Sequence, residues 1–367
     1  MGDRHDESRG VPANERLRQL RAEIDRLDAE ILERLNERGR LALEIGSLKH
    51  GDEQPIYAPH RERAVLARLR ELNRGGVYPD EAIEAIFGEI ISASRALEKP
   101  LHIAYLGPEA TFTHIAARRK FGVSVVYVPQ PTQQEVFREV EGCRCHYGVV
   151  PVENSTMGVV IDTLDLFSET SLRICGEVLL PITHNLLSKV PLDKVERIYS
   201  HQQAFAQCRG WLQEHLPGAE RIALSSTSEA ARRAAAEPNT AAIASQLAAE
   251  TYGLDILAEH IEDRVDNITR FLVVGHHAAE PTGNDKTSIR FMVRHEVGAL
   301  VRVLERFRDH GINLSSIESR PSRIRSWEYV FYIDVAGHAD VAPLAEALRE
   351  VERECQSLRV LGSYPCG

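Results

Sequence analysis

The segment from Asn267 to Phe271 places a hydroxyl, Thr269, beside a fixed cation, Arg270, just before the apolar run Leu272–Val274. An arginine at the entry to a buried strand needs a partner of opposite charge, because an unpaired buried charge is costly. A bound anion would supply that partner. A turn residue that caps a strand edge accounts for the same residues equally well, so this segment alone does not decide between chemistry and structure.

Length and composition predict several domains and require a locally basic site if the substrate is an anion. At 367 residues the chain is too long for one typical core, so two or three domains are expected. The net charge of -10 argues against a nucleic-acid partner. No apolar run is long enough to span a membrane, and the first ten residues lack the apolar core of a signal peptide. We therefore expect a cytoplasmic protein whose anionic substrate meets a locally basic site.

The six cysteines are too few for a disulfide scaffold. Cys143, Cys145 and His146 have the residue types of a zinc site, but no second ligand cluster lies at suitable spacing. We interpret these thiols as incidental and expect neither a metal nor another cofactor.

Residues 14–99 are predicted to form three helices. Apolar residues recur every three or four positions at Leu17, Leu20, Ile24, Leu27 and Ile31. This seam predicts a helix of more than 30 residues, which cannot cover its own apolar stripe. Further helices, from near His60 and over Asp80–Leu97, leave a thin core. We therefore expect an interdigitated dimer.

Several polar residues on these helices fall on shared faces. The residues concerned are Arg21, Arg38, Lys49, Arg61, Glu62, Ser94 and Glu98. Arg38 and Lys49 are 11 residues apart, about three turns, so they lie on one face. Arg21 is 17 residues before Arg38, roughly 100° round the helix, so it faces a different partner. Ser94 and Glu98 stack on one face of the third helix. Solvated surface charge is nevertheless the commoner fate of such residues.

This pattern resembles the small all-helical chorismate mutases. The resemblance implies that two arginines clamp the substrate carboxylates, Arg38 from the same chain and Arg21 from a second subunit. The rearrangement of chorismate to prephenate needs no nucleophile, so the enzyme only has to hold a dianion in a compact conformer and stabilise charge on the ether oxygen.

The remaining matches concern that ether oxygen and the ring hydroxyl. Lys49 matches the lysine on the ether oxygen, Glu62 the acceptor for the ring hydroxyl, and Arg61 its neighbour. Ser94 and Glu98 match the pair on the last helix. Glu98 stands where some relatives have glutamine, and it must be protonated to donate a hydrogen bond.

Residues 101–277 alternate apolar strands with helical stretches, which is an α/β pattern. Strands are predicted at His102–Leu106, Val123–Val128, Tyr147–Val150, Arg173–Leu180, Ala241–Ala244 and Phe271–Val274. Polar loops at the carboxyl ends of such strands are where α/β proteins bind ligands. These loops contain Thr111, Thr113, Glu153, Asn154 and Gln203. No G-x-G-x-x-G loop follows the first strand, so the pattern does not support a dinucleotide fold.

In this order and spacing, the loops and the Asn-x-Thr-Arg-Phe segment resemble the prephenate dehydratases, whose fold is two α/β lobes around a cleft. The resemblance implies that Thr269 is the catalytic hydroxyl, that Glu153, Asn154 and Gln203 line the cleft, and that Thr111, Thr113, Arg270 and Phe271 contact the substrate. Glu153 is the alternative proton donor. Ala110 replaces a usual glycine, and His201 is interpreted as a packed core residue.

Residues 286–364 follow a βαββαβ plan, with strands at Ser288–Val293 and Glu328–Val335 and a helix at Ala299–His310. Two motifs resemble the phenylalanine-binding segments of ACT regulatory domains, which have an α+β ferredoxin-like fold. They are Gly298-Ala299-Leu300-Val301 and Glu318-Ser319-Arg320-Pro321. The resemblance implies an allosteric phenylalanine site built from both motifs.

As a whole the chain resembles the bifunctional chorismate mutase–prephenate dehydratases of phenylalanine biosynthesis. That resemblance implies chorismate and prephenate as substrates, phenylalanine as a feedback inhibitor, and a homodimer or a dimer of dimers. Two alternatives stay open: a two-lobed amino-acid sensor without catalysis, and a mutase fused to a dehydrogenase. Thr269 and the mutase-like charges argue against the first, and the absent glycine-rich loop argues against the second.

Overall fold

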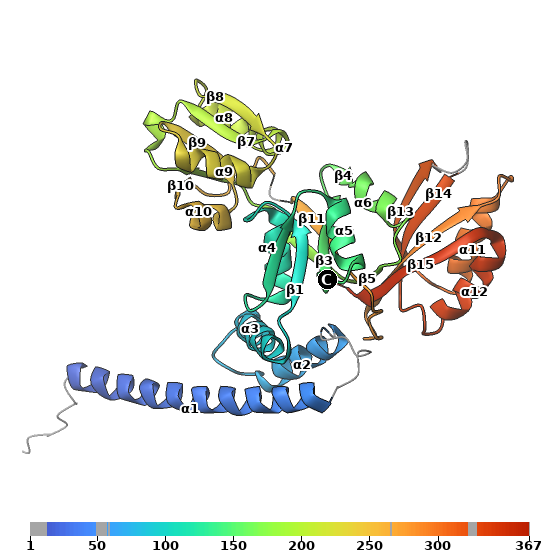
Figure 1. Ribbon diagram of the computed structural model, residues 1–367, viewed down its shortest axis with the longest axis horizontal. Coiled ribbons are helices and arrows are strands. Elements are labelled where there is room, and N and C mark those ends of the chain that lie inside the picture. Colours follow the sequence, from blue (N-terminus) through green and yellow to red (C-terminus); the bar gives the residue numbers. More distant parts are fainter. Residues whose placement is uncertain (1–12, 49–56, 58, 265, 322–328, 367) are drawn as a thin grey trace, which may run out of the picture.

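The computed structural model describes residues 13–48, 57, 59–264, 266–321 and 329–366. They form a helical domain, two α/β lobes and a C-terminal α/β domain (Figure 1). The first lobe lies in the middle of the molecule, with the second lobe at one end and the C-terminal domain at the other. No helix among the described residues is both long and apolar enough to cross a membrane.

The helical domain consists of α1 (Ala13–Leu48), α2 (Pro59–Leu72) and α3 (Asp80–Glu98). The C-terminal half of α1 packs on α3, where a methyl group added at Gly46 would lie 3.0 Å from Glu98 Cγ. The N-terminal half of α1 projects past the other elements (Figure 1). Its predicted seam is between 40% and 56% exposed, at Leu17, Leu20, Ile24, Leu27 and Ile31. Within the described part of the chain, this apolar stripe is therefore left uncovered.

Tyr57 and one buried arginine attach the helical domain to the first lobe. Tyr57 is 2% exposed, and its ring lies 4.9 Å from that of Phe121 and 5.3 Å from that of Tyr147. Arg95 of α3 pairs with Glu62 of α2 at 2.7 Å and donates to the Phe121 carbonyl at 3.2 Å. These contacts fix α2 and α3 against the lobe.

A six-stranded sheet forms the first lobe, in the order β2-β1-β3-β11-β5 with β4 paired to β3. Its strands are β1 (His102–Leu106), β2 (Val126–Gln130), β3 (Tyr147–Asn154), β4 (Gly158–Val159), β5 (Arg173–Pro181) and β11 (Ile268–Gly275). Its helices are α4 (Phe112–Phe121), α5 (Gln133–Glu141) and α6 (Ile161–Leu166). β11 enters antiparallel between β3 and β5, after the chain has built the second lobe.

A five-stranded sheet, in the order β10-β6-β9-β7-β8, forms the second lobe. Its strands are β6 (Asn185–Ser188), β7 (Arg197–His201), β8 (Glu220–Leu224), β9 (Thr240–Ala244) and β10 (Asp255–Ala258). Its helices are α7 (Gln202–Gln207), α8 (Arg209–His215), α9 (Thr227–Ala236) and α10 (Gln246–Tyr252), with a 3-10 turn at Leu192–Lys194. Ser226 caps α9 by accepting from the Glu229 N–H at 3.0 Å, as its Ser-x-x-Glu sequence favours.

The C-terminal domain has the predicted βαββαβ order and a sheet in the order β13-β14-β12-β15. Its elements are β12 (Asp285–Val293), α11 (Ala299–Asp309), β13 (Leu314–Pro321), β14 (Tyr329–Ala336), α12 (Leu344–Glu354) and β15 (Cys355–Pro365). The fold class predicted from the sequence is thus confirmed in all three parts. Differences are local: β2 begins at Val126 instead of Val123, and five strands were not predicted, each of five residues or fewer and so too short for periodicity to identify, namely β4, β6, β7, β8 and β10.

Arg270 of β11 is the centre of a buried polar cluster between the first lobe and the C-terminal domain. Its guanidinium pairs with Glu177 at 2.7 Å and with Asp334 at 2.5 Å. It also donates to the Tyr364 hydroxyl at 2.7 Å, and Lys286 pairs with Glu177 at 2.9 Å. Burial alone would lower the pKa of Arg270, but Tyr364, Asp334 and Glu177 outweigh it and raise that pKa. The cluster therefore holds a permanent charge inside the interface.

Replacing Arg270 by alanine should destabilise the protein strongly, because Asp334 would lose its charged partner in a buried interface. Removing one member of a buried ion pair typically costs about 3–5 kcal/mol of unfolding free energy. Urea unfolding should show this loss. Arg264, whose side chain is 77% exposed, provides the control, and Arg264→Ala should change stability by no more than ~0.5 kcal/mol. An Arg270→Ala protein as stable as this control would contradict the prediction.

Candidate active sites

A cavity of about 680 Å³ lies between the two lobes. The predicted residues Thr111, Thr113, Asn154, Gln203, Thr269 and Phe271 all line it. So do residues at the start of α4 and α9, two helices capped by Thr111 and Ser226. Helix N-termini present unpaired N–H groups and the positive end of the helix dipole, so this cavity suits carboxylates.

The alternation of side chains along β11 decides which of them reach the cavity. Asn267, Thr269 and Phe271 line it, whereas Arg270 and Leu272 line a small cavity of about 40 Å³ on the opposite face of the sheet. Successive residues of a strand point to opposite faces. Thr269 and Arg270 therefore belong to different sites, although they are adjacent in sequence.

Asn154 fixes the direction of the hydrogen bond at Thr269. Its Oδ1 accepts from Thr156 Oγ1 at 2.6 Å, from the Thr156 N–H at 3.1 Å and from the Met157 N–H at 3.1 Å. Three donors on Oδ1 determine the amide orientation, so Nδ2 donates to Thr269 Oγ1 and to Asn267 Oδ1, both at 2.8 Å. Since Thr269 Oγ1 accepts from Asn154, its own proton is available to a ligand in the cavity.

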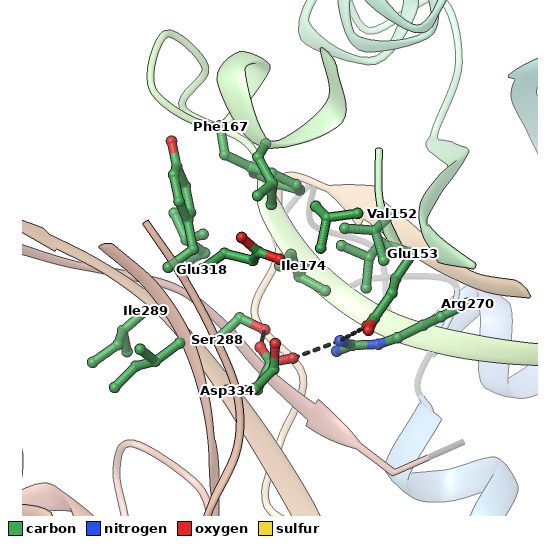
Figure 2. Close-up of a pocket in the computed structure, with 16 residues that line it drawn as sticks. Val152, Glu153, Phe167, Ile174, Arg270, Ser288, Ile289, Glu318 and Asp334 are labelled. Atoms are coloured by element: carbon green, nitrogen blue, oxygen red, sulfur yellow. Dashed lines mark hydrogen bonds and ion pairs between the residues drawn. The ribbon is translucent and has the colours of Figure 1, made fainter. Parts of the chain in front are cut away.

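Glu153 does not line this cavity, and the prediction that it does is wrong. Figure 2 shows its carboxylate directed toward Arg270, at 3.8 Å, on the side of the C-terminal domain. The register between β3 and β11 shifts there, so that Arg270 pairs with Glu153 but Phe271 pairs with Pro151. This β-bulge places Val152 and Glu153 together in the small cavity, while Asn154 faces the large one. Glu153 is therefore not placed to protonate a ligand beside Thr269.

Arg270 was predicted to contact the substrate, but it does not line the cavity that holds Thr269. Its guanidinium pairs with Glu153 and Asp334 on the side of the C-terminal domain. It also pairs with Glu177, which contacts Lys286 of that domain, and with Tyr364 of β15. The sequence argument that its charge needs a partner was correct, but protein carboxylates supply that partner.

The loop before α4 is held in the conformation that a glycine would favour. Ala110 has φ 61° and is 1% exposed, and a non-glycine residue in this left-handed region costs about 1–2 kcal/mol. Its N–H donates to His114 Nδ1 at 3.1 Å, and burial lowers the pKa of His114 to about 4, so that nitrogen stays an acceptor. The Ala110 carbonyl accepts from Ser245 of the second lobe at 3.2 Å. This loop thus joins the two lobes.

Several cavity residues were missed or misread in the sequence, four of them close to Thr269 or to the predicted Gln203. His184, Gln207 and Asn267 line the cavity and were not predicted as site residues. Gln207 lies four residues after the predicted Gln203, on the same face of α7, so helical spacing would have identified it. His201 also lines the cavity and caps α7 by accepting from the Gln203 N–H at 3.3 Å, so its interpretation as a core residue is wrong.

The helical domain brings together three of the predicted mutase residues. Arg38 donates to Ser94 Oγ, and Glu98 packs one turn further along the same face of α3. Arg21 is exposed and lies about 26 Å from Arg38 along α1, at 1.5 Å per residue. Arg21 cannot reach that cluster within one chain. Lys49 lies outside the described residues.

Glu62 and Arg61 do not join the Arg38 cluster in this chain, which corrects their predicted placement. Glu62 pairs with Arg95 on the face of α3 that packs on the first lobe, and Arg61 is exposed. Burial raises the pKa of Glu62, against the opposing effects of Arg95 and Lys120. Ser94 and Arg95 are consecutive, about 100° apart round α3, so their partners lie on different sides of that helix.

The two C-terminal motifs are only partly adjacent. Gly298, Ala299, Leu300 and Val301 line a pocket of about 270 Å³ together with Tyr329 and Phe331. Ser319 and Pro321 are the register partners of Phe331 and Tyr329, so they border this pocket. Glu318 and Arg320 point the other way, into the small cavity and to within 3.8 Å of Asp165, so they do not line this pocket within the chain. Alternation along β13 explains the division.

Comparison with known proteins matches each part of the chain to a family model. Chorismate mutase type II matches residues 20–99, prephenate dehydratase residues 103–279, and the ACT domain residues 287–353. The fold and the cavity thus define a protein with a mutase domain, a two-lobed dehydratase domain and a regulatory-type domain.

Full-length relatives have the same three parts in one chain. Proteins described as bifunctional chorismate mutase/prephenate dehydratase are 50% identical in Aquifex aeolicus and 47% in Pseudomonas aeruginosa, in both cases over 96% of this chain and 98% of the relative. The chain therefore belongs to the family of bifunctional chorismate mutase/prephenate dehydratases. It is an enzyme with both an isomerase and a lyase activity.

Two solved structures support the fold of residues outside the helical domain. The prephenate dehydratase of Arthrobacter aurescens, solved in complex with L-Phe, is 38% identical, with a TM-score of 0.67 over 72% of this chain and 90% of that one. A protein described as a quorum-quenching acylase is 30% identical, with a TM-score of 0.68 over 72% of this chain and 98% of that one.

Replacing Thr269 by valine keeps the side-chain shape and removes the hydroxyl. We expect the dehydratase kcat on supplied prephenate to fall by roughly 10²-fold or more, because a positioned proton donor contributes that much. Mutase activity should be retained. Glu153→Gln, on the other face of the sheet, is the matched comparison and should keep its kcat. A larger loss in Glu153→Gln than in Thr269→Val would return the proton-donor role to Glu153.

Proposed function

We propose that the two reactions take place at separate sites, the mutase reaction around Arg38, Ser94 and Glu98 and the dehydratase reaction in the cavity between the lobes. The observation that carries this proposal is the Thr269 hydroxyl, oriented by Asn154 as a donor inside that cavity. The corresponding domains are proposed to be residues 14–99, 101–277 and 286–364, and the proposed substrates are chorismate and prephenate.

Prephenate loses carbon dioxide and its ring hydroxyl to give phenylpyruvate, and formation of the aromatic ring drives the reaction. The enzyme therefore has to hold two carboxylates and supply a proton to a leaving hydroxyl. In our proposal the first turns of α4 and α9 receive the carboxylates. Thr269 donates to the leaving hydroxyl, a role that a weak acid can fill when the step is strongly downhill.

The mutase site requires a second copy of the chain in this proposal. Arg38, with Ser94 and Glu98 beside it, supplies one half of the carboxylate clamp, and Arg21 of another subunit supplies the other. The uncovered stripe from Leu17 to Ile31 gives that subunit an apolar surface to pack against. We therefore propose a homodimer formed through α1, or a pair of such dimers.

Phenylalanine is proposed as a feedback inhibitor that binds the pocket beside Gly298. The zwitterion would meet backbone groups at the start of α11, and the phenyl ring the apolar side chains of Leu300 and Phe331. Arg270 provides a physical route to the active site, because its cluster joins the C-terminal domain to the residue next to Thr269. A cytoplasmic location is also proposed, since all six cysteines are free thiols.

Arg21→Ala and Arg38→Ala should each lower mutase activity by about 10²-fold or more, because each removes one half of the clamp. Mixed and re-formed from the two variants, half of the dimers are heterodimers with one intact site each. The mixture should then regain about one quarter of wild-type mutase activity. Steady-state assays before and after mixing test this, and no recovery would refute a site shared between subunits.

Gly298→Val should raise the phenylalanine concentration needed for inhibition by a factor on the order of ten, equivalent to about 1.4 kcal/mol of binding. Gly298 has φ 77° and borders the pocket, so the new side chain would both strain the backbone and enter the ligand space. Gly311→Val, with φ 67° and no neighbour within 4 Å, controls for strain alone. Calorimetry showing equal phenylalanine affinity in both variants would contradict this site.

A further inference from the structure

A continuous chain of hydrogen bonds runs from Thr269 across the lobe boundary to His184. Asn154 Nδ2 donates to Thr269 Oγ1 at 2.8 Å, and Thr156 Oγ1 donates to Asn154 Oδ1 at 2.6 Å. Gln207 Nε2 donates to Thr156 Oγ1 at 3.2 Å, and Gln207 Oε1 lies 2.8 Å from His184 Nε2. Thr156 belongs to the first lobe and Gln207 to α7 of the second, so the hydrogen bond between them connects the two lobes.

The direction of every bond in this chain is determined. The amide of Asn154 is fixed by the Thr156 and Met157 backbone N–H groups that donate to Oδ1, so the Thr156 hydroxyl must also donate to Oδ1 and can only accept from Gln207. Gln207 therefore offers Nε2 to Thr156 and keeps Oε1 as an acceptor. An acceptor facing His184 requires that Nε2 of the imidazole carry the proton.

The surroundings of His184 support that assignment. The residue is 2% exposed and lies in the connection between β5 and β6 that joins the lobes. Its backbone N–H donates to Glu262 Oε2 at 2.8 Å, and its backbone carbonyl accepts from the Ile261 N–H at 2.8 Å. Its ring contacts Phe112 edge to face. Burial lowers the pKa of His184, so the imidazole is neutral and Nδ1 carries a lone pair. Among the described residues, Nδ1 has no hydrogen-bond partner.

We propose that His184 is a positioning residue for the dehydratase reaction: its Nε2–H holds the Gln207 amide with Nε2 toward Thr156, which supports the Thr156 hydroxyl as a donor to the Asn154 amide that orients Thr269. The series of hydrogen bonds is complete only when Gln207 reaches Thr156, so this support from the second lobe depends on closure of the two lobes. This inference rests on the proposed role of Thr269, which the Thr269→Val variant tests independently. His184 acts on the reaction through Gln207, Thr156 and Asn154.

Two polar substitutions of His184 separate this role from simple packing. The amide nitrogen of glutamine occupies the place of imidazole Nε2, whereas that of asparagine occupies the place of Nδ1 and is too short to reach Gln207. We expect His184→Gln to keep the dehydratase kcat within about threefold, and His184→Asn to lower it roughly tenfold or more, with little change in KM. Mutase activity, measured in the same preparations, should be unchanged in both and reports on folding.

The pair His184→Asn and Gln207→Leu provides a second readout. If both residues act through one chain, the double variant should have a kcat no lower than that of Gln207→Leu alone, because the chain is already broken. His146→Leu removes a half-buried histidine of the first lobe outside the cavity and should leave kcat unchanged. A wild-type kcat in His184→Asn, an equal loss in His184→Gln, or additive losses in the double variant would each overturn the proposal.

Discussion

The alternation of side chains along β11 is the constraint on which the functional parts of this protein depend. Thr269 points into the cavity between the lobes, and Arg270 points into the cluster shared with the C-terminal domain. Adjacent residues of a strand move together, so a shift of the C-terminal domain relative to β11 would act on the strand that carries Thr269. The proposed catalytic hydroxyl and the contact with the C-terminal domain thus lie on adjacent residues, on opposite faces of one sheet.

Buried charge contributes to both domain interfaces, beside the apolar packing found at each. Arg95 attaches the helical domain to the first lobe, and Arg270 attaches the C-terminal domain to it. Such pairs add little net stability relative to apolar contacts, but they are costly to break, because each leaves an uncompensated charge in a dry interface. They therefore favour one relative placement of the domains over others. The apolar stripe of α1 differs from these interfaces, because its described residues carry no buried charge pair and are left exposed until another apolar surface covers them.

The sequence predicts the elements of this fold well where periodicity is long, as in α1, and where capping residues are explicit, as at Ser226. It predicts Thr269 and Asn154 correctly as cavity residues, because strand ends and motif order locate them. It fails at Glu153, since a β-bulge reverses the face of one residue and leaves no mark in the sequence. Glu62 fails for a related reason: its partner Arg95 is chosen by tertiary docking, which no helical spacing encodes. The sequence does not indicate a role for His184, because its hydrogen bond to Gln207 forms only in the tertiary structure.

A crystal structure of the full chain with phenylpyruvate bound tests the central claim most directly, because the product retains one carboxylate and the aromatic ring. The account predicts the ligand in the cavity between the lobes, with its ring within contact distance of Thr269 and its carboxylate at a helix N-terminus, while Arg270 keeps its bonds to Glu177 and Asp334. A ligand that binds the Arg270 guanidinium, on the other face of the sheet, would contradict it.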